Sequence, residues 1–201
     1  DGFLIESPVT WYSSRDEWAM SPGYDAPQHF GFERIADVGC LVCHVGNIGS
    51  KKGNSFRAVI HEGAVGCESC HGPGSLHVKR RTNEETVFDG PDYSIVHPKR
   101  LTRERREDVC ANCHLRGEAT SYLRGRNVGE FRPGIPLSDV RIDYRIDVDG
   151  AQMTVVGHVE QMRLSQCYIQ SDSLTCTTCH NPHGQPSRDD QIGISECRER
   201  G

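Results

Sequence analysis

Eight of the ten cysteines in this 201-residue chain belong to one repeated pattern, which constrains the chain more than any other feature. The pattern is Cys-x-x-Cys-His, and its four copies begin at Cys40, Cys67, Cys110 and Cys176. This spacing is the attachment signature of c-type haem. Residues three apart lie on one face of a helical turn, so both thiols reach the same porphyrin. The histidine that follows supplies the proximal imidazole to the iron.

The sequence therefore predicts four covalently bound c-type haems, each with its iron. The predicted attachment residues are Cys40, Cys43, Cys67, Cys70, Cys110, Cys113, Cys176 and Cys179, and the predicted proximal ligands are His44, His71, His114 and His180. Two Cys-x-x-Cys pairs can also form a structural zinc site, but 23 residues separate the first two pairs, against a usual spacing of roughly 15–20. Zinc also gives no reason for a histidine directly after every pair, and no βαβ pattern supports thioredoxin-like chemistry.

Hydropathy argues against a membrane span, and charge argues against a nucleic-acid partner. No apolar run approaches the roughly 18 residues of a membrane span, and the net charge of −5 comes without the basic cluster of a nucleic-acid surface. Covalent haem is attached outside the cytoplasm, so we expect an exported protein, periplasmic or extracellular. The first residues lack the basic and apolar regions of a secretory signal, so the chain is expected to be a mature form or a fragment.

The predicted domain organisation is one tetrahaem domain, 1–201. Within it, 1–39 is an N-terminal segment rich in aromatic residues, 40–183 is the haem-binding core and 184–201 is a C-terminal tail. Porphyrins supply apolar bulk, so a large regular core is unnecessary. The motifs begin at uneven intervals, which argues against an array of equal repeats.

Regular secondary structure is expected to be sparse, because glycine and proline interrupt the chain often. The fold is predicted to be mostly irregular, with short helices around stacked haems. A charged, proline-free stretch predicts a helix over 101–114, with its charges on a solvated face. Alternating apolar and polar residues around Asp149-Gly150 predict one β-hairpin near 140–156.

The distal ligand of each iron decides between an electron carrier and an enzyme. Six histidines lie outside the motifs, enough to give every iron a second imidazole. The favoured distal ligands are His29, His77, His158 and His183, with His61 in reserve and His97, before Pro98, the weakest candidate. His183 follows its own proximal histidine too closely to reach the far side of that haem, so it would bind a neighbour's iron. Methionine ligation, which raises the potential, is the less favoured alternative.

Five stretches together carry a resemblance to a known family. They read HEGAVGCESCHGPGSLH (61–77), WAMSPGYDAPQHFGF (18–32), CANCHL (110–115), FRPGIPLSD (131–139) and TCTTCHNPH (175–183). The first resembles the second haem motif of multihaem c-type cytochromes related to the hydroxylamine-linked tetrahaem cytochrome. The others resemble the haem-binding domain of exported tetratricopeptide-repeat cytochromes. The resemblance implies a multihaem cytochrome c architecture and low-potential electron transfer through closely stacked haems. It also matches His29, His77 and His183 to distal positions, and His158 to an HVEQM stretch found in part of the group.

The chain departs from that family in three ways. An upstream segment carrying another histidine is missing, so one distal ligand is expected to come from elsewhere, and no tetratricopeptide repeats follow. Where the family often has a fifth motif, the chain reads Cys197-Arg198-Glu199-Arg200-Gly201, which cannot attach a haem. Cys167 and Cys197 are thus left over, and an oxidising compartment favours a disulfide between them.

Three functions remain open at this point. The first is electron transfer through four closely spaced haems, with redox proteins as partners. The second is a protomer of an extracellular conducting filament, in which further copies of the chain share some ligands. The third is a multihaem enzyme of nitrogen-oxide or hydroxylamine type, which needs one iron with an open distal position. The surplus of histidines favours the electron carrier.

Overall fold

The computed structural model describes residues 3–29, 31–51, 54–83, 90–115, 117, 119–144 and 157–184. The chain divides into two compact units, Asp1–Val65 and Gly66–Gly201, which are described separately. The division falls inside the predicted core, between the first and second motifs, and the single-domain organisation stays a prediction. Within the described residues, no helix has both the length and the apolar character needed to cross a membrane.

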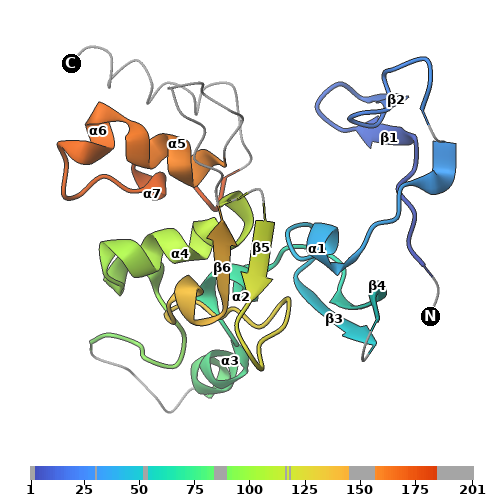
Figure 1. The fold of residues 1–201 in the computed structure, drawn as a ribbon. Helices are drawn as coiled ribbons and strands as arrows, with labels where there is room; N and C mark the ends of the chain where they lie inside the picture. The colour runs from blue at the N-terminus through green and yellow to red at the C-terminus, as the bar shows by residue number, and fades with distance from the viewer. Residues whose placement is uncertain are drawn as a thin grey trace. The chain divides into compact units, whose positions relative to one another are not determined.

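The first unit consists of short strands and single helical turns (Figure 1). Its elements are β1 (Val9–Tyr12), β2 (Glu17–Met20), the 3-10 turn η1 (Gly31–Glu33), α1 (Val38–Leu41), β3 (Asn47–Lys51) and β4 (Asn54–Glu62). β1 and β2 pair antiparallel, with Trp11 opposite Trp18. The connecting turn closes at Asp16, whose φ of 56° is a left-handed conformation that aspartate tolerates. The two indole rings meet edge to face, 5.6 Å between centroids.

β3 and β4 form the second antiparallel pair and support α1, in which the first motif begins. The chain passes between α1 and β3 through Gly46, whose backbone N–H donates to the Glu62 carbonyl at 3.1 Å. A Cβ at residue 46 would lie 2.3 Å from the Ala64 carbonyl oxygen. Only glycine therefore permits this close approach, which holds the segment after His44 against the end of β4.

The second unit contains most of the helices and the third strand pair (Figure 1). Its elements are α2 (Cys67–His71), α3 (Ser75–Thr82), η2 (Pro98–Arg100), α4 (Arg103–His114), β5 (Ala119–Tyr122), η3 (Leu137–Asp139), β6 (Arg141–Tyr144), α5 (His158–Leu164), α6 (Gln166–Ile169) and α7 (Cys176–Cys179). α4 is the central element, in contact with α2, α5, η2 and η3.

A small apolar core lies against α4. Its buried members are Ala111, Phe131, Leu137, Val140 and Val159, with Leu115, Tyr122 and Ile135 packed around them. The core joins α4, η3 and the start of α5, which lie far apart in sequence. Its five buried members come from the described residues of the second unit.

The predicted helix is confirmed as α4, which begins after Thr102 and ends at His114. Thr102 caps its N-terminus by accepting a hydrogen bond from the Arg105 backbone N–H at 3.3 Å. The expected solvated face is correct only in part. Glu104 is exposed, but Glu107 is among the most buried side chains of the chain, at 1% exposure.

The strands differ from the single predicted hairpin, because the described residues hold three antiparallel pairs. β6 lies where the alternation predicts a strand, and its described partner is β5. The turn at Asp149-Gly150 and the return strand lie outside the described residues. β1 and β2 are too short to show clear alternation. The β3–β4 pair shifts register at Ser50/Lys51, and such irregularities break the two-residue period that reveals a strand.

Candidate functional site

Each of the four motifs lies on a helix or a single helical turn. The second occupies all of α2, the third forms the last turn of α4, and the fourth occupies α7 with His180 directly after it. The first begins in α1, where the Asp37 side chain accepts a hydrogen bond from the Cys40 backbone N–H at 3.0 Å. Cysteines three apart therefore share a helix face in the second, third and fourth copies, as attachment to one porphyrin requires.

His71, the predicted proximal ligand of the second haem, is held in a defined orientation. Its Nδ1 lies 2.8 Å from the carbonyl oxygen of Val96, 25 residues away in sequence. A histidine that binds a metal through one ring nitrogen usually donates its other N–H to a carbonyl or carboxylate. This hydrogen bond leaves Nε2 of His71 as the nitrogen available for iron.

The second unit brings cysteines of its three motifs close together. The side chains of Cys110 and Cys176 share a hydrogen bond, which raises the pKa of Cys110 and lowers the pKa of Cys176 to about 7 because it stabilises the Cys176 thiolate. Cys70 lies near enough to raise the pKa of Cys110 further. Three motifs separated by 40 residues or more in sequence therefore converge around α4.

The proximal histidines of the third and fourth motifs are also neighbours. Partial burial lowers the pKa of His114, and His158 and then His180 lower it further because a second positive charge nearby disfavours the protonated ring. The Nδ1 atoms of His114 and His158 lie 3.2 Å apart, and their ring centroids are 5.2 Å apart. The structure thus pairs His158, a predicted distal ligand, with a predicted proximal one.

Arg141 of β6 holds the helix end that carries the third motif. Its guanidinium donates to the carbonyl oxygens of Asn112 at 3.0 Å, Ala111 at 3.2 Å and Leu115 at 3.3 Å. The last carbonyls of a helix generally lack donors within it, and the C-terminal end of a helix attracts positive charge. The Ala111 carbonyl also accepts the Leu115 backbone N–H at 3.0 Å. Arg141 also forms an ion pair with Asp143 at 3.0 Å, and both side chains are buried. The orientation of Cys113 and His114 therefore depends on a strand 27 residues further along the chain.

Glu107 joins α4 to α5 and α6 on the side of the fourth motif. Its carboxylate accepts from the Tyr168 hydroxyl at 2.9 Å and from Nη2 of Arg163 at 3.1 Å, and Arg103 lies 3.3 Å away. Burial and the Glu107 carboxylate raise the pKa of Tyr168. The charge of Glu107 also acts on Cys176. This network of hydrogen bonds fixes the two helices that precede the fourth motif.

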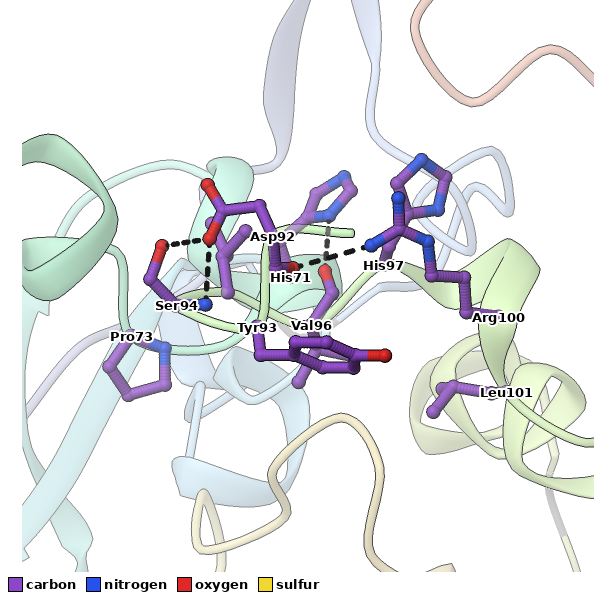
Figure 2. Close-up of a pocket in the computed structure, with 10 residues that line it drawn as sticks. His71, Pro73, Asp92, Tyr93, Ser94, Val96, His97, Arg100 and Leu101 are labelled. Carbon is purple, nitrogen blue, oxygen red and sulfur yellow. Dashed lines mark hydrogen bonds between the residues drawn. The ribbon is translucent and has the colours of Figure 1, made fainter. Parts of the chain in front are cut away.

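A pocket of about 370 Å³ lies beside His71 (Figure 2). It is lined by His71, Pro73, residues 92–97, Arg100 and Leu101. Its volume is within the range of roughly 300–1,000 Å³ that is usual for cofactor sites. Figure 2 shows the hydrogen bond between His71 and Val96 at the end of the pocket where the ring of His97 also lies.

Two further histidines lie at similar distances from His71. The ring centroid of His183 is 6.0 Å away with nearly parallel planes, and that of His97 is 6.3 Å away with perpendicular planes. Two imidazoles on one iron have centroids about 6 Å apart, since each metal–nitrogen bond is about 2 Å and each ring centre lies about 1 Å beyond the nitrogen. His97 follows Val96, whose carbonyl occupies the Nδ1 side of His71. His97 is therefore the less suitable of the two as a second ligand of that iron, and His183 is the better candidate.

His77, another predicted distal ligand, is fixed by a carboxylate. It lies on α3, and its Nδ1 is 3.0 Å from Oδ2 of Asp92 and 3.3 Å from Oγ of Ser94. Hydrogen bonds from Ser94 and then Arg81 hold the pKa of Asp92 well below its usual range. The sequence did not single out Asp92. Only the Asp-x-Ser turn at 92–94 hints at its place, and the contact with His77 spans 15 residues.

Within the described part of the first unit, His29 and His61 show no ring contact with another histidine. His29 and His61 are exposed, and Nδ1 of His29 accepts a hydrogen bond from the Gly31 backbone N–H at 3.1 Å. Cys167 is exposed on α6. Cys197 lies outside the described residues, so the disulfide stays a prediction.

The residues present fit covalent haem better than a directly bound metal ion. Helical cysteine pairs and a His71 whose Nε2 is left for a metal are what a porphyrin and its iron require. Among the described residues, no group of three or more His, Cys, Asp or Glu side chains is arranged to hold a metal ion. When bound, each haem would supply one-electron chemistry, with His71, His114 and His180 in the second unit and His44 in the first as proximal ligands.

Comparison with known proteins also points to proteins with c-type haem. Residues 15–72 match the family model of cytochrome c554 and c-prime. The chain is similar to cytochrome c-554 of Nitrosomonas europaea, with 27% identity over 116 residues, 55% of this chain and 48% of that protein. It is also similar to the multiheme cytochrome MtrA of Shewanella baltica, with 24% identity over 176 residues, 75% of this chain and 47% of that protein.

The chain thus spans about half the length of the curated relatives it matches. No solved structure gives a significant match. The family match covers the first motif and the whole of the second, and the similarity to MtrA extends over three quarters of the chain. These likenesses support a multihaem c-type cytochrome, and the resemblance that the sequence predicts is confirmed.

Proposed function

We propose that this chain transfers electrons through four covalently bound c-type haems and is exported to the periplasm or beyond the cell. The observation that supports this most is the convergence of the second, third and fourth motifs in one unit, where Cys110 contacts Cys176 and lies near Cys70. Electron transfer between redox groups weakens steeply with distance. Attachment points this close favour passage of single electrons from haem to haem.

The ligand set that we propose gives every iron two imidazoles. His183 serves the haem of His71, because their ring centroids lie 6.0 Å apart. His158 serves the haem of His114, because it is the predicted distal ligand that lies beside His114. His29 and His77 remain for the other two irons. Two imidazoles on each iron leave no position for a substrate, and they hold potentials below those of irons with a methionine ligand.

The spin state of the iron tests the ligand proposed for the second haem. Replacing His183 by Ala is expected to convert one of four haems from low-spin to high-spin, because one iron loses its sixth ligand. His97→Ala is the matched control, since His97 lies equally near His71 but beside the Val96 carbonyl. Low-temperature electron paramagnetic resonance of the oxidised holoprotein measures both. A wholly low-spin spectrum of His183→Ala, with a high-spin signal in His97→Ala, would transfer the assignment to His97.

Kinetics separate the electron carrier from an enzyme. A low-potential donor is expected to reduce all four haems rapidly, with no turnover of nitrite or hydroxylamine, because six-coordinate irons change charge without changing ligands. Stopped-flow absorbance and a steady-state assay of both compounds provide the measurement. Sustained turnover of either at about 1 per second or faster, the usual range of enzymes, would contradict the carrier and indicate an open iron.

A further inference from the structure

We propose that Asp92 is a positioning residue that sets the orientation of His77 and lowers the reduction potential of the haem whose iron His77 binds. This inference rests on the proposed function, in which His77 is a distal ligand. It adds a residue that the motifs do not contain, because Asp92 belongs to the segment between α3 and η2.

The contact between the two side chains is short, and its carboxylate side is only slightly exposed. Nδ1 of His77 lies 3.0 Å from Oδ2 of Asp92, whose side chain is only 12% exposed. A carboxylate can only accept at this distance, so Nδ1 carries the proton and donates it. Nε2 is left as the nitrogen with a free lone pair. Asp92 therefore selects the tautomer of His77 that binds iron.

Three neighbouring donors hold the carboxylate itself in place. The Ser94 backbone N–H donates to Oδ1 at 2.8 Å, and the Ser94 hydroxyl donates to the same oxygen. The Arg81 guanidinium donates to Oδ2 from Nε at 2.9 Å and from Nη2 at 2.7 Å. Arg81 lies one turn after His77 on α3. One helix therefore presents both the imidazole and the cation to a single carboxylate.

The effect on redox chemistry follows from the charge of the acceptor. A carboxylate that accepts the Nδ1–H makes the imidazole a stronger donor to its metal. A stronger donor stabilises ferric iron more than ferrous iron, so the equilibrium for uptake of one electron moves toward the oxidised state. Arg81 shares Oδ2 and partly offsets this effect.

The experiment compares Asp92→Asn with the wild-type holoprotein. Asparagine has nearly the same shape but is a neutral, weaker acceptor. One of four haems is expected to favour reduction about tenfold more, which is about 59 mV for one electron, and its low-spin g-values are expected to shift. Potentiometric titration and electron paramagnetic resonance provide the measurements. Asp139→Asn, at an exposed aspartate of η3, is the control for loss of charge and is expected to leave the g-values unchanged.

Two further variants make the outcome decisive. Asp92→Glu retains the carboxylate and is expected to lie closer to wild type than Asp92→Asn. If Asp92→Asn yields no holoprotein, Arg81→Ala replaces it and is expected to shift the same haem in the opposite direction. His77→Ala separates the two proposals by creating one high-spin haem if His77 is a ligand. If His77→Ala creates a high-spin haem but Asp92→Asn leaves the potentials and g-values unchanged, the role of Asp92 is overturned. His77 then remains a ligand. A wholly low-spin His77→Ala overturns His77 as a ligand and the inference with it.

Discussion

The denatured holoprotein is expected to exceed the mass of its polypeptide by four haem masses. Thioether bonds are covalent and survive unfolding, so intact-mass spectrometry counts the haems directly. Replacing Cys110 and Cys113 together by Ala is expected to lower the count to three. The expected loss is one whole haem, because both thioether cysteines of the third motif are removed.

The matched control for this count is Cys167→Ala. Cys167 is also a cysteine of the second unit, but it is exposed on α6 and outside the motifs. That variant is expected to retain four haems. A count other than four in the wild-type protein, or an unchanged count after loss of Cys110 and Cys113, would refute the assignment of the motifs.

Replacing Arg141 by Ala is expected to cost about 3–5 kcal/mol of unfolding free energy, the range for removing one partner of a buried ion pair. The change leaves the Asp143 carboxylate buried without its cation and removes the donor to three carbonyls at the end of α4. Urea unfolding followed by far-ultraviolet circular dichroism gives the measurement.

Two variants show whether the cost comes from the geometry of Arg141. Arg141→Lys keeps the charge but lacks the planar fork that reaches several acceptors at once, so an intermediate loss is expected. Arg15→Ala removes an exposed ion pair with Glu17, which is expected to cost less than about 1 kcal/mol. Equal effects of Arg141→Ala and Arg15→Ala would show that the guanidinium does not hold the end of α4.

The helices that carry the motifs could be anticipated from sequence, but the strands largely could not. α4 has an N-cap at Thr102 and a charged, proline-free sequence, both of which favour a helix. It lies where the sequence predicts a helix. β1 and β2 have four residues each, and β3 and β4 pair with shifted register. Short and irregular strands leave little periodicity to detect, because pairing with a partner rather than local preference stabilises them.

The candidate site divides in the same way. Attachment of haem depends on two cysteines and a histidine within five residues, so the sequence by itself predicts which residues bind the porphyrin and supply the proximal imidazole. Distal ligation depends on residues that approach from elsewhere. Composition shows that enough histidines exist, but it cannot show that His183 lies 6.0 Å from His71 or that His158 contacts His114.

Only the tertiary structure decides the surroundings of these ligands. Glu107 belongs to a run of charges that the sequence predicts to be solvated, yet contacts with Arg163 and Tyr168 bury it. Asp92 contacts His77, which lies 15 residues away in sequence. Arg141 binds the end of α4, which lies about 30 residues away in sequence. The sequence alone thus predicts the chemistry of haem attachment, because the residues that it requires are near neighbours in the chain. The order and orientation of the ligands come from packing, because hydrogen bonds between distant segments exist only once the chain has folded.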